Sequence, residues 1–103
     1  MSKQKSAKNV YEELGFADAE QMLVKAQLVS KIADILRERG WTQQHAAEIL
    51  GLSQPKLSKM LRGQFRGISE IKMMDCLVRL GRDVKIVVLS EAESRGRLEV
   101  VAA

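Results

Sequence analysis

The sequence predicts a small all-α protein, a bundle of four to five helices followed by one C-terminal β-strand. The chain has 103 residues, which is enough for one domain and too few for two independent cores. Its apolar residues are mostly Leu, Ile, Val, Ala and Met, with 4% aromatic residues and one proline. Several stretches repeat apolar residues every three or four positions, which is the period of an α-helix.

The longest of these stretches begins after Asp18 and ends at Gly40. Asp18 and Gln21 have the spacing of a capping box, and Arg37 and Arg39 carry the charge that suits a helix C-terminus. Apolar residues recur between these ends at Met22, Leu23, Ala26, Val29, Ile32, Ala33 and Leu36. We expect one helix of about 22 residues here.

Two short helices are predicted next, each bounded by a capping residue and a glycine. Thr42 precedes the first, QQHAAEIL, which ends at Gly51. Ser53 precedes the second, which ends at Gly63. Pro55 stands in the first turn of the second helix, where its missing N–H costs nothing.

A fourth helix is predicted to begin after Ser69 and to end at Gly81. Its expected inward stripe is Ile71, Met74, Leu77, Val78 and Leu80. The period changes after Asp83, where VKIVVL at 84–89 is rich enough in β-branched residues to predict a strand.

The residue counts exclude several classes of function. Cys76 is the only cysteine, so neither an intrachain disulfide nor a multi-cysteine zinc site can form. His45 is the only histidine, which leaves little material for metal binding or for a histidine-dependent hydrolase. No apolar run approaches the roughly 18 residues of a membrane helix, and the N-terminus lacks the apolar stretch of a secretory signal. We expect a cytoplasmic non-enzyme with no catalytic residue, metal, cofactor, membrane contact or small-molecule substrate.

The net charge of +4 is unevenly distributed along the chain. Residues 1–9 carry three lysines and no acid. Residues 41–67 carry Lys56, Lys59, Arg62 and Arg66 against the single acid Glu48. The second group coincides with the two short helices, and clustered cations favour an anionic partner such as nucleic acid.

The two short helices also have the spacing of a helix-turn-helix unit. If Gln43 is position one, Ala47 is the fifth residue, Gly51 the ninth, Leu57 the fifteenth and Met60 the eighteenth. Ala47 must be small because the second helix crosses over it, and Gly51 must adopt the left-handed conformation of the turn. This spacing predicts DNA binding in preference to an ordinary solvated basic face.

Residues 42–63, TQQHAAEILGLSQPKLSKMLRG, resemble the lambda-repressor-like, Xre-type helix-turn-helix proteins. The chain is similar in particular to HigA-like antitoxins of toxin–antitoxin pairs. The matching pieces are LGFADAE at 14–20, RERGWTQ at 37–43, LGLSQPKLS at 50–58, LRG at 61–63 and LGRDVKIVV at 80–88. Trp41 stands where an aliphatic residue is more usual in that family. The resemblance implies a lambda-repressor-like bundle.

We divide the chain accordingly into three parts. Residues 1–17 are expected to be a mobile basic N-terminal arm, and residues 91–103 a flexible tail. Residues 18–90 form the helix-turn-helix DNA-binding domain, which carries the dimerisation strand at 84–89.

In this class of protein the second helix of the unit lies in the major groove of DNA. The residues expected to face the bases are Gln54, Pro55, Lys56, Ser58 and Lys59. A glutamine can pair with adenine, and a lysine can reach guanine O6 or N7. Gln43 resembles the family's phosphate contact at a helix N-terminus, and Arg62 and Arg66 are expected to hold phosphates at the flanks.

A single strand after four helices has no partner strand in its own chain, and an unpaired edge favours pairing with another chain. Antiparallel pairing of two copies through Val84, Ile86, Val87 and Val88 predicts a homodimer. Such a dimer can read a palindromic operator in double-stranded DNA, with half-sites about 34 Å apart. The alternative is that the strand packs back on its own helices.

The leading interpretation is a dimeric, sequence-specific transcriptional repressor. By resemblance it is the antitoxin of a bacterial type II toxin–antitoxin system, which represses its own operon and neutralises a RelE-like toxin. Residues 1–17 and the first long helix are both candidates for the toxin-binding surface. Two alternatives stay open: a stand-alone Xre-type regulator, for example from a prophage, and a protein-interaction module that binds no DNA.

Overall fold

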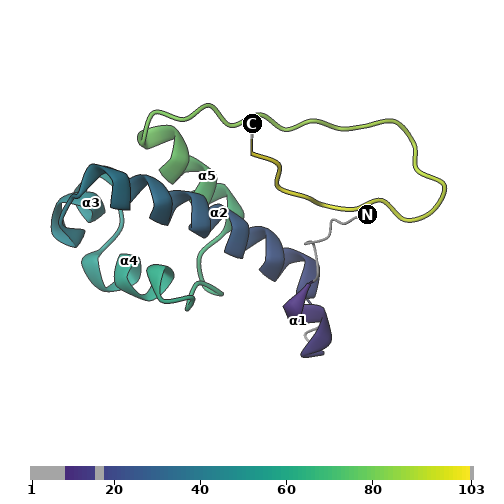
Figure 1. Ribbon diagram of the computed structural model, residues 1–103, viewed down its shortest axis with the longest axis horizontal. Helices are drawn as coiled ribbons and strands as arrows, with labels where there is room; N and C mark the ends of the chain where they lie inside the picture. The colour runs from purple at the N-terminus through teal and green to yellow at the C-terminus, as the bar shows by residue number, and fades with distance from the viewer. Residues whose placement is uncertain (1–8, 16–17, 103) are drawn as a thin grey trace.

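The computed structural model describes residues 9–15 and 18–102 (Figure 1). Over these residues the chain forms five helices and no strand. The helices are α1 (Val10–Glu13), α2 (Ala19–Arg39), α3 (Gln43–Leu50), α4 (Gln54–Leu61) and α5 (Glu70–Arg79). The long helix α2 is the centre of the bundle: α1, α4 and α5 all contact it, and α3 packs against α4 and α5. The all-α prediction is confirmed.

Local sequence signals explain where the last three helices begin. The hydroxyl oxygens of Thr42, Ser53 and Ser69 each accept a backbone N–H three residues further on, at 3.1 to 3.2 Å. These bonds satisfy N–H groups that have no partner within the helix. Helices α2 and α3 end at glycines in the left-handed conformation, Gly40 and Gly51. The predicted positions of α2 to α5 are therefore confirmed.

Asp18 departs from its predicted role as a capping residue. It precedes α2, but its side chain makes no capping hydrogen bond. Its carboxylate instead forms an ion pair with the guanidinium of Arg66, 48 residues further along the chain. The capping-box prediction is wrong because a charged partner from the segment after α4 competes for the same carboxylate.

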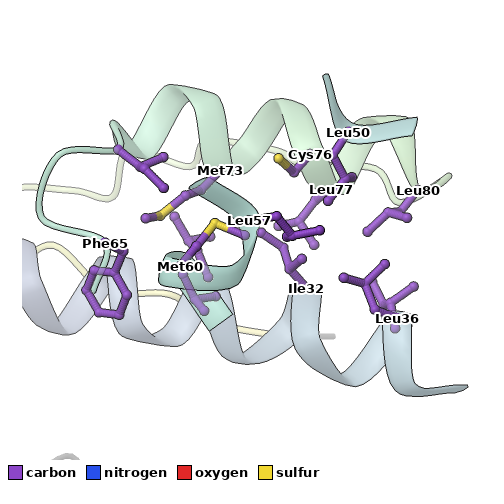
Figure 2. Close-up of a cluster of buried hydrophobic side chains, with 14 of the residues drawn as sticks. Ile32, Leu36, Leu50, Leu57, Met60, Phe65, Met73, Cys76, Leu77 and Leu80 are labelled. Atoms are coloured by element: carbon purple, nitrogen blue, oxygen red, sulfur yellow. The ribbon is translucent and has the colours of Figure 1, made fainter. Parts of the chain in front are cut away.

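The core lies where α2, α4 and α5 meet (Figure 2). Ile32 of α2, Leu57 and Met60 of α4 and Met73 and Cys76 of α5 are completely buried. None of the described residues with a polar or charged side chain is buried. The interior is therefore aliphatic and sulfur-containing, as the composition predicts.

The inward face of α5 differs from the predicted stripe. Leu77 and Leu80 are buried as expected, but Ile71 is 70% exposed and Val78 is 55% exposed. Met73 and Cys76 are buried in their place. Helix α5 has apolar residues on two faces, and contact with α2 and α3 determines which face lies inside. An exposed apolar surface consequently remains on the outside of α5.

Helix α1 lies within the segment predicted to be an N-terminal arm. The Asn9 side-chain amide donates to the carbonyl oxygen of Ala19 at 3.1 Å, which joins α1 to the start of α2. Residues 1–8, which hold the three lysines of the arm, and residues 16–17 lie outside the described residues.

The strand predicted at 84–89 is absent from the described part of this single chain. After α5 the chain swings away from the helices in a wide loop and returns toward α2 (Figure 1). A strand exists only through hydrogen bonds to a neighbouring strand, and the described residues offer none to this segment. Val84 packs against the core, whereas Ile86, Val87, Val88 and Leu89 are exposed.

The tail predicted at 91–103 is described as far as residue 102 and returns to the helices. The Glu20 carboxylate accepts the backbone N–H of Leu98 at 3.2 Å and pairs with Arg95 at 3.3 Å. Val100 packs partly against the core. These contacts place the end of the tail beside the start of α2.

Gly51→Ala is expected to lower the free energy of unfolding by more than about 1 kcal/mol, because an L-residue is strained at this positive φ. The added Cβ would also lie 2.9 Å from the Arg79 Nη1 atom. Gly63→Ala separates the two effects, because Gly63 has a positive φ of 89° and no atom within 4 Å of its added Cβ. Gly67→Ala should be close to neutral. Equal losses in Gly51→Ala and Gly63→Ala on urea unfolding would show that the contact with Arg79 has no effect.

Candidate nucleic-acid interface

Helices α3 and α4 form a tight helix-turn-helix, and its turn is determined by two small residues. Gly51 has φ 69°, and its N–H bonds to the carbonyl oxygen of Ala47. The N–H of Leu52 donates to the same carbonyl at 3.0 Å. Ala47 is buried, which fits the requirement for a small side chain beneath α4. The roles predicted for Ala47 and Gly51 agree with this geometry.

Helix α4 is buried on one side and exposed on the other. Leu57 and Met60 are inaccessible to solvent and join the helix to the core. Gln54, Pro55, Lys56 and Lys59 are exposed. Four of the five residues predicted to face bases therefore lie on an accessible, basic surface of one helix.

Ser58, the fifth of these residues, is partly buried and bound to a neighbour. Its hydroxyl accepts a hydrogen bond from Arg62 Nη1 at 2.6 Å. The bond holds the Arg62 guanidinium at the C-terminal end of α4. In this arrangement Ser58 positions an arginine predicted to bind phosphate.

The segment after α4 is attached to the first half of α2. Besides the ion pair between Arg66 and Asp18, the carbonyl oxygen of Arg66 accepts a hydrogen bond from Lys25 Nζ at 2.9 Å. An open hollow of about 680 Å³ separates this segment from α4, and Lys56, Lys59 and Arg66 are among its lining residues. Three cations therefore border one depression beside the exposed side of α4.

Gln43 is the first residue of α3 and is exposed. The N-terminus of a helix favours negative charge, because its N–H groups and its dipole both point outward. This position suits the predicted phosphate contact. The neighbouring Trp41 is partly buried, with the Arg39 guanidinium 5.1 Å from its ring centre and the His45 ring packed edge-on at 4.7 Å.

A group of charged residues that was not predicted from the sequence holds the helix-turn-helix in place. Lys72 Nζ, on α5, donates to the carbonyl oxygen of Leu50 at 2.9 Å. Arg79 Nη1, two turns further along α5, donates to the carbonyl oxygen of Ile49 at 3.3 Å. Both acceptors belong to the last turn of α3, where carbonyl groups lack partners within the helix and carry partial negative charge.

Asp75 lies between these two cations on α5. Its carboxylate is 3.2 Å from Lys72 Nζ and 2.9 Å from Arg79 Nε. Hydrogen bonds from Lys72 and then from Arg79 lower the pKa of Asp75 below its ordinary value. The Asp75 carboxylate holds both cations toward α3. Its contribution to stability is present above its ordinary pKa and is lost as the pH falls through the lowered value.

We call Lys72, Asp75 and Arg79 the α5 charge cluster. Its cations lie 22 and 30 residues from the carbonyl groups they contact, so no local pattern in the sequence reveals their role. A helical spacing of three and four residues between an acid and two bases is the only signal, and it is common on solvated helices.

Among the described residues no group of His, Cys, Asp and Glu side chains could hold a metal ion. The described helices include none that combines the length and apolarity of a membrane span. Cys76 is buried, and burial raises the pKa of its thiol. This environment makes the thiol less reactive.

The sequence profile of a helix-turn-helix domain family matches residues 10–89. A solved structure described as an XRE-family transcriptional regulator is similar to this chain with a TM-score of 0.76 and 34% identity. The similarity covers 84% of this chain and 99% of the other. The chain belongs to the XRE family of helix-turn-helix transcriptional regulators. Among proteins of curated function, none matches the chain.

Membership of the XRE family confirms two predictions made from the sequence, DNA binding and a function other than catalysis. An XRE-family regulator binds double-stranded DNA through its helix-turn-helix, and it is not an enzyme. In this chain the helix-turn-helix consists of α3 and α4.

Lys72→Met is expected to lower the free energy of unfolding by about 1 kcal/mol, the net value of one hydrogen bond. The substitution keeps the length of the side chain and removes its bond to the Leu50 carbonyl. Lys31→Met, at an exposed position on α2, controls for the loss of one charge. The measurement is the urea midpoint at pH 7, and equal midpoints for the two variants would contradict a structural role for Lys72.

Proposed function

We propose that this XRE-family protein is a homodimeric repressor that reads a palindromic operator through the exposed face of α4. The observation that carries the proposal is the combination of a buried inner face and an exposed basic outer face on α4, beside a hollow bordered by three cations. A rigid helix with one free, basic face is what major-groove recognition requires.

The residues have separate roles in this proposal. Gln54, in the first turn of α4, pairs with adenine through its amide, and Lys59 donates to guanine. Pro55 and Lys56 complete the surface that faces the bases. Phosphate contacts position the helix without reading sequence. They come from Gln43 at the N-terminus of α3, and from Arg62 and Arg66 beyond α4.

The ion pair with Asp18 affects how Arg66 can serve DNA. The Arg66 side chain remains 58% exposed while its Nη1 atom contacts the Asp18 carboxylate. A guanidinium has five N–H donors, so one arginine can bind a carboxylate on one edge and a phosphate on another. Asp18 then orients Arg66 toward the hollow beside α4.

A second copy of the chain is part of the proposal, because one recognition helix contacts only a half-site. The apolar surface left on the outside of α5, at Ile71 and Val78, supports it. The four exposed aliphatic residues at 86–89 also support it. Exposed large apolar side chains on a small protein favour a protein–protein contact.

The finer proposal is that the protein is the antitoxin of a bacterial type II toxin–antitoxin pair. It would act in the cytoplasm, repress the shared operon and neutralise a RelE-like toxin. Its support is the resemblance of the five sequence pieces quoted above to HigA-like antitoxins. Most of these pieces lie at helix junctions, for example LGLSQPKLS across the turn from α3 to α4. These pieces therefore contain residues that shape the fold as well as residues that carry the resemblance.

A stand-alone XRE-type regulator is the second candidate. It is favoured by the similar solved structure, which is described as a transcriptional regulator. Both candidates share the DNA-binding surface and differ in whether a toxin is bound.

Simultaneous Gln54→Ala and Lys59→Ala substitution is expected to abolish specific binding to DNA from upstream of the protein's own gene. Loss of two base contacts, each of about 1 to 3 kcal/mol, should weaken binding by at least tenfold. Gln21→Ala with Lys31→Ala removes the same residue types from exposed positions on α2 and should bind normally. The measurement is a gel shift against specific and unrelated DNA. Unchanged specificity in the α4 variant would contradict the assignment of α4.

Co-expression with the product of the adjacent gene separates the two candidate functions. An antitoxin should restore growth to cells that express the neighbouring gene and should co-purify with its product. A stand-alone regulator should do neither, while still shifting its operator. The Gln54→Ala, Lys59→Ala variant is the matched control, since it should keep neutralisation and lose operator binding.

A further inference from the structure

The segment after α5 has backbone groups without partners and side chains that suit pairing. Among the described residues, 83–89 takes part in no backbone hydrogen bond. Val84 packs partly against the core, while Ile86 is 76% and Val88 is 90% exposed. Successive side chains of a strand point to opposite faces. Ile86 and Val88 would therefore share the inner face that Val84 already occupies.

Symmetry limits how two copies of this segment can pair. Opposed residue pairs in an antiparallel ladder alternate between hydrogen-bonded and non-hydrogen-bonded pairs. A two-fold axis can exchange two pairs only if both are of the same kind. Neighbouring pairs are of different kinds, so the axis cannot lie between them. It must pass midway between one residue and the copy of that residue on the other chain. Each candidate register is thus named by a single central residue.

The charges along the segment discriminate among the candidate centres. Centring on Lys85 opposes two lysines, and like charges directly opposite are destabilising. Centring on Val87 opposes Asp83 to Glu91, and centring on Val88 opposes Asp83 to Glu93. Centring on Leu89 opposes 84–87 to residues 91–94, of which only Ala92 is apolar. A centre at Val84 would require pairing with the last residue of α5.

Centring on Ile86 avoids all of these conflicts. It opposes Val84 to Val88, Lys85 to Val87 and Asp83 to Leu89. All seven residues of 83–89 are then paired, and no like charges face each other. Val84, Ile86 and Val88 of both copies lie together on the inner face, which gives six adjacent aliphatic side chains.

We propose that two copies pair antiparallel through residues 83–89 with Ile86 on the two-fold axis. The proposal rests on the homodimer proposed above and adds its register and its inward face. The partner's Leu89 then lies opposite Asp83, next to the C-terminal end of α5, where Val78 is exposed. This register positions the two α4 helices relative to one another, and thereby the spacing of the two half-sites.

Cysteine cross-linking tests the register directly. Ile86→Cys should form a disulfide-linked dimer under mild oxidation, because opposed Cα atoms lie about 4.5 to 5.5 Å apart, within the range of a disulfide. Lys85→Cys and Val87→Cys should each cross-link about tenfold less, since their own copies lie beyond the roughly 7 Å limit. A mixture of the Lys85→Cys and Val87→Cys proteins should cross-link to each other. The parent, whose Cys76 is buried, is the control.

The outcomes separate the register from the dimer itself. If Val87→Cys cross-links alone in place of Ile86→Cys, the register is overturned and the homodimer stands. If no variant cross-links although light scattering shows a dimer, the segment is not the interface and the register again fails. If light scattering shows a monomer at the concentration used for operator binding, the homodimer fails as well. Circular dichroism of each variant checks that the helices are intact.

Discussion

The contact between the end of α3 and the side of α5 supports the surface that we propose reads DNA. Helix α3 ends at Gly51, and its last carbonyl groups, at Ile49 and Leu50, point toward α5 without helical partners. Lys72 and Arg79 donate to them, with Asp75 holding both cations. Because α4 follows only three residues later, the direction in which α4 leaves the turn depends on how firmly the end of α3 is held.

The same type of contact occurs where α2 meets the C-terminal end of α5. Arg39, the last residue of α2, donates to the carbonyl oxygen of Leu80 at 2.6 Å, directly after α5. Arg82 lies 4.0 Å from the Glu38 carboxylate at the same junction. In both places a cation from one helix bonds the partially negative C-terminus of another. The aliphatic core provides non-directional attraction, and these bonds fix the relative positions of helices that could otherwise slide.

The sequence predicts what is determined locally and misses what depends on distant partners. Thr42, Ser53 and Ser69 cap helices through residues only three positions away, so their roles are readable from sequence. Asp18 has the same local pattern and fails as a cap, because Arg66 reaches it from 48 residues away. Helix α5 offers two apolar stripes, and packing against α2 and α3 buries Met73 and Cys76 in place of Ile71 and Val78. The predicted strand at 84–89 needs a hydrogen-bonded partner strand, and the described residues supply none.

The candidate site shows the same division. The exposure of Gln54, Pro55, Lys56 and Lys59 follows from helical periodicity once Leu57 and Met60 are assigned to the core. The α5 charge cluster could not be predicted, since its acceptors are backbone carbonyl groups of another helix. The bond from Arg62 to Ser58 could not be predicted either, and it gives Ser58 a contact with an arginine in addition to its predicted place facing the bases.

We propose that a fixed α4, duplicated by a two-fold axis, reads two adjacent major grooves. Base-modification interference on the protein's own upstream DNA is the decisive measurement, because it reports contacts to guanine N7 in the major groove. Two sets of interfering positions are expected on one face of the duplex, separated by about 34 Å, one helical turn. A single set of positions, or interference confined to minor-groove atoms, would contradict it.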